Sequence, residues 1–380
     1  MFENKHRTNT TTVSANPLRR SALAIGVALA AGSFAVPAAA EFSLESDSGW
    51  KAGFNGHIPV FAVIGSYDDP EEDSFNITTG FNPATLQTNI YAPTQNGIDV
   101  SGHFQMNADF APGDADANFR SRVSEIAVAG DFGTVNIGKG FGIFGVPAIG
   151  DNGSALGVGL IGSPDSVAAT AGRIGNGYFY ANFNPRVMYT SNSMGGLQFK
   201  VGVFSPSKLS SAEDPTDDAE YSLPRFEGNV VYSTDMFSLW TSAFTQDVDS
   251  KTGTFDGYTM SGVDVGGSVS AGGLTVRGNY SMTSGTGNAV FAARLDANEE
   301  DASQWYVEST YDFGRTTLGA SYGEGEDDIN SDANDTDLTM IFGRYAATDA
   351  LTFMAEYTMF GTNGAPGEYD AFIVGSQLTF

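Results

Sequence analysis

Side chains along this chain alternate between apolar and polar in runs of roughly ten residues. In Ile98–Phe110 every second residue from Ile98 onward is apolar or glycine, and the residues between them are Asp, Ser, His, Gln and Asn. Leu274–Thr283, Trp305–Phe313 and Phe372–Phe380 repeat the pattern. Because successive side chains of a strand point to opposite faces, the alternation predicts β-strands with one apolar and one polar face.

About sixteen such runs follow one another, and their connections predict an antiparallel meander. They centre on Trp50–Tyr67, Ala84–Tyr91, Ile98–Phe110, Arg122–Gly130, Thr134–Lys139, Arg186–Asn192, Leu197–Ser205, Arg225–Thr234, Met236–Thr245, Met260–Ala271, Leu274–Ser284, Ser303–Phe313, Thr316–Gly323, Leu338–Ala346, Ala350–Phe360 and Tyr369–Phe380. Short turns alternate with long acidic connections such as Ser207–Ser222, Gly285–Ala302 and Glu324–Asp337. This predicts one plain end and one elaborated end.

A soluble β-sandwich and a membrane β-barrel both fit the alternation, since one buries its apolar face and the other presents it to lipid. Sixteen strands are too many for one sandwich, and an even number closes a barrel without unpaired edges. The runs are also close to the 9–11 residues that a tilted strand needs to cross a bilayer. We therefore predict an all-β protein: a transmembrane antiparallel up-and-down β-barrel of about 16 strands, wide enough to hold water.

Composition excludes several other classes. The 380 residues include 18 Lys and Arg against 45 Asp and Glu, which gives a formal net charge of −27. Such acidity excludes a general nucleic-acid binder, which needs a basic surface. Mean hydropathy is −0.14, so no bundle of transmembrane helices is expected. Aromatic residues make up 12% of the chain, which argues against disorder.

Residues 1–40 have the pattern of a secretory signal peptide. A basic segment ending at Arg20 precedes the apolar run Ser21–Pro37, and three alanines precede Glu41. Cleavage after Ala40 would leave a barrel domain of residues 41–380. The removed segment holds four basic residues and one acidic residue, so the remainder carries 14 basic and 44 acidic residues, a net charge of −30.

Two segments and the chain terminus resemble the general porins of the Gram-negative outer membrane. Gly130–Lys139 is similar to the family's turn-and-strand segment, and Arg186–Ser191 followed by Gly195–Phe199 is similar to another. The resemblance implies a homotrimer that passes ions and small hydrophilic solutes passively and contacts membrane lipid and lipopolysaccharide. It also implies that barrel-assembly machinery reads a C-terminal signal made of Phe372, Val374, Leu378 and Phe380.

The resemblance further implies that the third long loop folds into the lumen and narrows it. The segment after Lys139, up to about residue 181, is apolar and Gly-rich, unlike the other long connections, and this favours an infolded loop. In the family, loop carboxylates face basic groups on the wall. The corresponding candidates here are Asp151 and Asp165 on the loop, with Lys139, Arg186, Arg122, Arg173 and Lys200 as basic partners.

The polar strand faces supply candidate lumen-lining residues: His57, Asp99, His103, Gln105, Asp109, Arg277 and Glu308. The strand face that carries Arg344 also carries Met340 and Phe342, so these apolar side chains are expected inside as well. The acidic balance predicts a preference for cations, because charged mouths concentrate counter-ions. Neither a cofactor nor a metal ion is expected, since acidic runs such as Asp327–Asp337 lack an ordered ligand spacing.

Two other functions fit parts of the sequence. A channel selective for a sugar or another defined solute would use aromatic tracks, for which Phe141, Phe144, Tyr178 and Tyr180 are candidates. A barrel hydrolase would need a histidine beside a nucleophile and an orienting acid. His57 and His103 have the polar parity for a lumen site, but no serine motif accompanies them.

Overall fold

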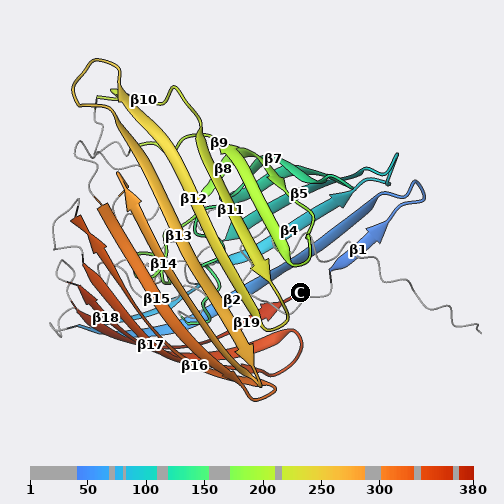
Figure 1. Ribbon diagram of the computed structural model, residues 1–380. Helices are drawn as coiled ribbons and strands as arrows, with labels where there is room; N and C mark the ends of the chain where they lie inside the picture. Colours follow the sequence, from blue (N-terminus) through green and yellow to red (C-terminus); the bar gives the residue numbers. More distant parts are fainter. Residues whose placement is uncertain are drawn as a thin grey trace, which may run out of the picture.

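Antiparallel strands form one sheet that closes on itself (Figure 1). The computed structural model describes residues 41–67, 73–79, 83–108, 119–153, 172–209, 216–286, 301–328, 335–362 and 368–380. Within these ranges no helix is long and apolar enough to cross a membrane. The described strands are β1 (Phe42–Glu45), β2 (Lys51–Tyr67), β3 (Ser74–Thr78), β4 (Ala84–Tyr91), β5 (Asp99–Ala108), β6 (Phe119–Gly130), β7 (Gly133–Phe141), β8 (Phe183–Thr190), β9 (Leu197–Phe204), β10 (Ala219–Glu220), β11 (Arg225–Ser233), β12 (Phe237–Ser250), β13 (Tyr258–Ala271), β14 (Leu274–Ser284), β15 (Asp301–Asp312), β16 (Thr316–Asp327), β17 (Thr336–Ala346), β18 (Leu351–Thr362) and β19 (Tyr369–Thr379).

Sixteen positions make up the described wall, as the alternation predicts. β3 and β4 share one position, because both pair with the long strand β2. The short strands β1 and β10 extend the sheet beside β2 and β12. The barrel closes where β19 pairs with β2, from Tyr369 opposite Tyr67 to Thr379 opposite His57. The predicted up-and-down barrel is therefore confirmed.

Short turns gather at one end of the barrel, hereafter the turn end, and the long connections at the other, the loop end. Gly272 and Gly273, with φ of 57° and 90°, join β13 to β14. A two-residue hairpin of this kind needs positive φ at both positions, and glycine adopts it without steric cost. The dipeptide thus fixes the register of two neighbouring wall strands.

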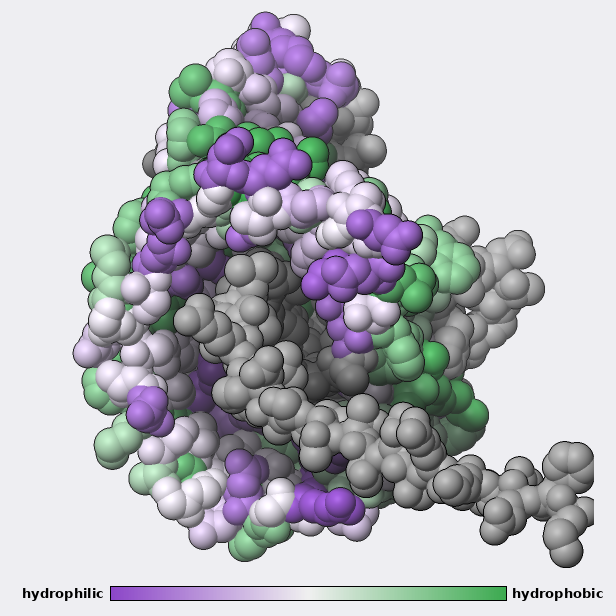
Figure 2. All heavy atoms as spheres, turned by 90° about the vertical axis from the view of Figure 1, so that its right-hand side faces the viewer, coloured by the Kyte–Doolittle hydropathy of each residue, from purple (hydrophilic) through white to green (hydrophobic). Residues whose placement is uncertain are grey.

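Burial in this barrel is inverted relative to a soluble protein. Val265, Ile341 and Leu239 are 58%, 57% and 54% exposed, whereas Gln304 and Ser281 are completely buried. Seen toward one end, hydrophobic side chains lie along the outer flanks and hydrophilic ones around the opening (Figure 2). An apolar outer surface with a polar interior is the arrangement of a barrel in lipid, and the sandwich alternative is wrong.

One part of the inner wall departs from this polarity. Met340 and Phe342 face inward with Arg344, as their shared parity predicts, and are 0% and 5% exposed. They pack with inward-facing apolar residues of β2 and β19, among them Phe61 and Ile373. This section of the wall is therefore apolar on both faces.

The inverted burial predicts a depth-dependent cost for charge on the outer face. Val265→Arg, at the middle of β13, is expected to destabilise the folded barrel by about 2–4 kcal/mol in lipid. Leu274→Arg, beside the turn at the start of β14, is expected to cost only about 0–1 kcal/mol because its guanidinium reaches the interface. Equilibrium unfolding in phospholipid vesicles measures both changes, and equal costs would contradict an outward-facing Val265.

Candidate functional site

The connection between β7 and β8 enters the barrel and is held by carboxylates of the barrel wall. Glu227 of β11 accepts hydrogen bonds from the backbone N–H groups of Ile143 and Phe144, at 2.6 and 3.0 Å. Asp264 of β13 accepts one from Gly145 at 3.1 Å. Because ionised acceptors form the stronger hydrogen bonds, these two side chains fix the start of the loop against the wall.

A third wall carboxylate, Glu308 of β15, holds the loop further along. Both of its oxygens accept the backbone N–H of Asn152, at 2.7 and 2.9 Å, and one accepts the Asn152 side-chain amide at 3.0 Å. The Gly153 N–H donates to Glu308 as well, at 2.9 Å. Glu308 faces the lumen as its parity predicts and is buried beneath the loop.

Donors on neighbouring strands bind the carbonyl groups of the same loop segment. Arg277 of β14 donates to the Pro147 carbonyl at 2.9 Å, and the Tyr306 hydroxyl of β15 donates to Ala148 at 2.7 Å. Arg344 of β17 donates to the carbonyl of Asn152. Carboxylates therefore bind the N–H groups of the loop and arginines bind its carbonyls, which satisfies backbone that would otherwise lie buried and unpaired.

The returning part of the loop is bound to the wall at β14, β16 and β17. Arg173 is completely buried and donates to the Leu338 carbonyl at 2.8 Å and to the Ser321 hydroxyl. The Thr336 hydroxyl donates to Gly175 at 3.1 Å, and Asn279 to Gly177 at 3.2 Å. Both described parts of the loop thus lie inside the barrel, and the predicted infolding is confirmed for residues 142–153 and 172–182.

Asp151 lies enclosed between loop and wall and does not face open water. It is 1% exposed and accepts a hydrogen bond from the Tyr178 hydroxyl at 2.9 Å. Burial raises the pKa of the Asp151 carboxyl, and the nearby Glu308 carboxylate raises it further, while Arg173 acts in the opposite direction. Asp151, Arg173, Arg277 and Glu308, all candidates from the sequence, therefore meet in one network that anchors the loop.

Aromatic residues of the loop pack against the wall. Phe144 contacts Phe244 edge-on with ring centroids 4.7 Å apart, and Tyr178 meets Tyr306 at 6.0 Å. Phe144 and Tyr178 are each 2% exposed, and Phe141 is 5% exposed. These three rings fill the space between loop and wall. Tyr180, the fourth candidate, is half-buried beside Phe141, with ring centroids 5.5 Å apart. One half-exposed ring does not make the continuous surface on which a sugar could stack.

A second cluster of charged residues lies on β6, β8 and β9, close to where the loop leaves β7 and enters β8. Arg186 forms an ion pair with Glu125 at 2.8 Å, and both side chains are nearly buried. A Cβ at Gly140 would lie 1.9 Å from the Arg186 guanidinium, so a larger residue there would displace this side chain. Lys200, on β9 next to β8, lies close enough to Arg186 and Glu125 to interact electrostatically with both. Arg186 and Lys200, both candidates from the sequence, are therefore brought together here.

Arg122 and Lys139, two further basic candidates, take different positions. The β5–β6 ladder shifts register at Gln105 and Met106, and Arg122 is the extra residue of this bulge, with its guanidinium 5.2 Å above the Phe183 ring. The β6–β7 pairing continues without a shift past Gly138, so Lys139 keeps the outward parity of Ile137 and donates to the Ser121 carbonyl at 3.0 Å. The structure therefore does not bring Lys139 to the lumen.

The lumen-lining candidates on β2 and β5 face inward near the turn end. His103 bonds Ser101 and Asn89 at 2.8 and 2.9 Å, and Gln105 donates to Asn107 at 2.9 Å. His57 lies on the same inward face of β2, and Asp99 accepts a hydrogen bond from Thr94. Asp109 and Asp165 lie outside the described residues.

Several residues that hold the loop were not singled out from the sequence. These are Glu227, Asp264 and Ser321, all at inward parity. Arg344 was expected inside, but its bond to the loop was not. For Glu227 and Asp264 the available signal was a charged residue within a strand, flanked by apolar residues or glycine. It marks a group that needs a partner inside the barrel.

Comparisons with known proteins agree with this geometry. A family model described as Gram-negative porin matches residues 21–365. The chain belongs to the Gram-negative porin family. Among curated proteins no sequence matches this porin.

Solved structures of other porins share its fold at low sequence identity. The outer membrane channel DcaP of Acinetobacter baumannii superposes with a TM-score of 0.67 at 16% identity, over 89% of this chain and 99% of that one. An anion-selective porin from Comamonas acidovorans gives 0.66 at 12% identity, over 87% and 100%. OmpF of Salmonella typhi in complex with daunomycin gives 0.62 at 13% identity, over 89% and 100%.

Family and fold together make this protein an outer-membrane channel of a Gram-negative bacterium. The family is one of channels and not of enzymes, so the barrel hydrolase is set aside. Within the part of the chain that the structure describes, no three His, Cys, Asp or Glu residues converge on a metal site.

The anchoring network makes Glu308 the most informative position on the wall. Glu308→Ala removes the acceptor of three N–H groups, each worth about 1.5–3 kcal/mol to a charged partner, and is expected to free the middle of the loop. We expect higher and noisier single-channel conductance and faster entry of larger sugars into proteoliposomes. Glu326→Ala, on the outer face of β16, is the matched control. Unchanged conductance and size limit in Glu308→Ala would contradict the anchoring role.

Proposed function

We propose that this porin is a water-filled channel for passive diffusion of ions and small hydrophilic solutes. The observation that carries the proposal is the fixed loop, whose N–H groups are held by Glu227, Asp264 and Glu308 inside a barrel with a mostly polar inner face. We expect a loop fixed in this way to narrow the passage without closing it. The buried loop aromatics favour this general channel over a sugar-selective one.

We further propose that the channel prefers cations and that its mouths, not its narrowest part, set the preference. Two inward-facing ion pairs offset each other's charge inside the barrel, Arg186–Glu125 at 2.8 Å and Arg225–Glu227 at 2.6 Å. The acidic surplus lies mainly in the connections. Described carboxylates at the loop end include Asp217, Glu220, Asp249, Asp256, Asp301, Asp328, Asp335 and Glu368. A relative of the same fold is titled anion-selective. Whether a channel of this fold prefers cations or anions therefore has to depend on where its charges lie and not on the fold.

Rim charges make a specific prediction about salt. The reversal potential in a KCl gradient should indicate K⁺ over Cl⁻, and this preference should fall as salt rises, since the Debye length shrinks from about 10 Å at 0.1 M to about 3 Å at 1 M. Planar-bilayer recordings of the reconstituted protein measure both. Anion selectivity at low salt would refute the cation proposal. Saturable block of the current by a sugar would contradict the general channel and support a sugar-selective one.

We also propose that residues 1–40 are removed after export and that three copies assemble in contact with lipopolysaccharide. OmpT of Vibrio cholerae, a structural relative with a TM-score of 0.52, is titled as a trimer form. Phe372, Val374 and Leu378 form an outward-facing row, 46%, 39% and 43% exposed, and the Phe380 backbone pairs with Gly56. We propose that the assembly machinery reads this C-terminal row.

One preparation tests these proposals together. Native mass spectrometry of the extracted protein should give the mass of three copies with bound lipopolysaccharide. The mass of the denatured chain should correspond to residues 41–380. Phe380→Ala should lower the amount of folded protein in the outer membrane by severalfold, while leaving the backbone pairing with Gly56 possible. A monomer, an uncleaved chain or an undiminished Phe380→Ala level would each overturn the corresponding proposal.

A further inference from the structure

Two basic side chains lie on the outer face of the wall toward the loop end, Arg122 of β6 and Lys139 of β7. Lys139 has the parity of the exposed Ile137 and donates to the Ser121 carbonyl at 3.0 Å. The bulge in β6 places Arg122 beside Ser121, opposite the outward-facing Met106, and so turns Arg122 to the same face. No other basic residue lies on the outward face of the described strands.

Within the described residues no carboxylate offsets these two charges. The Arg122 guanidinium lies 5.2 Å above the Phe183 ring and donates to the Tyr180 hydroxyl. Lys139 binds a backbone carbonyl. The partners of both cations are therefore neutral. An uncompensated charge on the lipid face of a membrane protein is costly, and this points to a ligand of opposite charge at the site.

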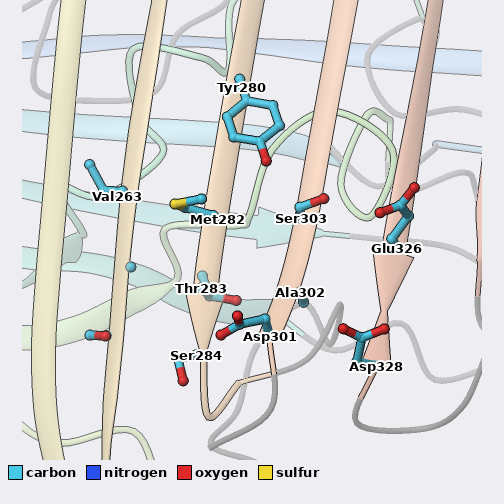
Figure 3. A pocket seen from close by; sticks show the side chains of 12 residues that line it. Val263, Tyr280, Met282, Thr283, Ser284, Asp301, Ala302, Ser303, Glu326 and Asp328 are labelled. Carbon is cyan, nitrogen blue, oxygen red and sulfur yellow. The ribbon is translucent and has the colours of Figure 1, made fainter.

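Across the barrel, the outer face carries the opposite charge. Figure 3 shows Asp301, Glu326 and Asp328 along a hollow of the outer face at the loop end of β15 and β16. In the strand order these two strands lie about halfway round the barrel from β6 and β7. Carboxylates repel an anion, so the outer face favours an anionic ligand at Arg122 and Lys139 and disfavours one on the opposite side.

The position of the two cations identifies the chemistry of this ligand. In an outer-membrane barrel the short turns are periplasmic and the long loops extracellular, so the loop end meets the outer leaflet. This leaflet consists largely of lipopolysaccharide, whose sugar head carries phosphates above its acyl chains. The hydroxyl-bearing side chains of Ser121 and Ser124 stand exposed beside Lys139. Toward the middle of the wall follow Ile126 and Ile137, which are 52% and 48% exposed.

We propose that Arg122 and Lys139 bind a phosphate group of lipopolysaccharide. The planar guanidinium of Arg122 binds two phosphate oxygens, the Lys139 ammonium adds a point charge, and acyl chains cover Ile126 and Ile137. The inference rests on the lipopolysaccharide contact proposed above, to which it assigns a place on the wall and a chemistry. It does not depend on the ion preference of the channel.

The phosphate is tested first on the unchanged protein. The protein is extracted from the outer membrane, freed of lipopolysaccharide in detergent, and titrated in EDTA with purified lipid A that carries two phosphates or none. Native mass spectrometry counts the bound lipid. We expect the phosphorylated lipid A to bind about 25-fold more tightly, which is about fivefold for each cation at a lipid surface.

Arg122→Gln combined with Lys139→Gln should bring this ratio close to one. The matched control is Lys51→Gln with Arg315→Gln, which removes two exposed cations at the turn end and should keep the ratio. Arg122→Lys with Lys139→Arg preserves both charges and should keep most of it. If the double glutamine variant does not fold, Lys139→Gln alone should lower the ratio about fivefold.

The outcomes separate this site from the wider proposal. If the unchanged protein binds neither lipid A, the lipopolysaccharide contact fails as a whole. If it prefers the phosphorylated lipid and the glutamine variants keep that preference, only the site is wrong. Binding that requires Mg²⁺ would identify a metal bridge to carboxylates. Separation of the three copies in the glutamine variant, with lipid preference unchanged, would identify a contact with a second copy. Either result overturns the proposal.

Discussion

Complete pairing of the backbone is the constraint on which this structure depends. Hydrocarbon provides no partner for an unpaired N–H or C=O group, so a sheet in a membrane has to close. The seam between β19 and β2 achieves this, and the N–H and carbonyl of Phe380 extend it by pairing with Gly56. The last residues of the chain thus complete the sheet begun by β2, which gives the C-terminus a structural role apart from any recognition signal.

Closure also determines where polar groups can lie. With lipid outside, the polar face of every strand turns inward, and lone charged side chains in mid-strand need partners there. In this porin the infolded loop supplies many of them, since Glu227, Asp264 and Glu308 bind its N–H groups and Arg277 and Arg344 its carbonyls. The wall and the loop are therefore stable as a pair, because each satisfies the polar groups of the other.

The sequence predicts the wall well and the loop contacts poorly. Alternation over ten residues identifies all sixteen wall positions in the described chain, whereas β1, β3 and β10, with four, five and two residues, are too short for a period to emerge. The resemblance to general porins implies that the loop folds inward, and its apolar, Gly-rich composition favours this. The partner of Glu308 is 156 residues away, however, and no local pattern encodes such a pair. For the same reason Asp151, expected to face the pore, is instead enclosed with Arg173.

Because the lumen charges hold the loop, they have a limited effect on passing ions. Glu308 is buried beneath the loop, whose N–H groups occupy its oxygens, so a passing ion does not contact this carboxylate directly. The Arg186 guanidinium is offset by the opposite charge of Glu125. We therefore expect the residues that hold the narrow part of the channel in shape to be poor filters. This is why the proposed ion preference is assigned to charge at the mouths, where screening by salt is strongest.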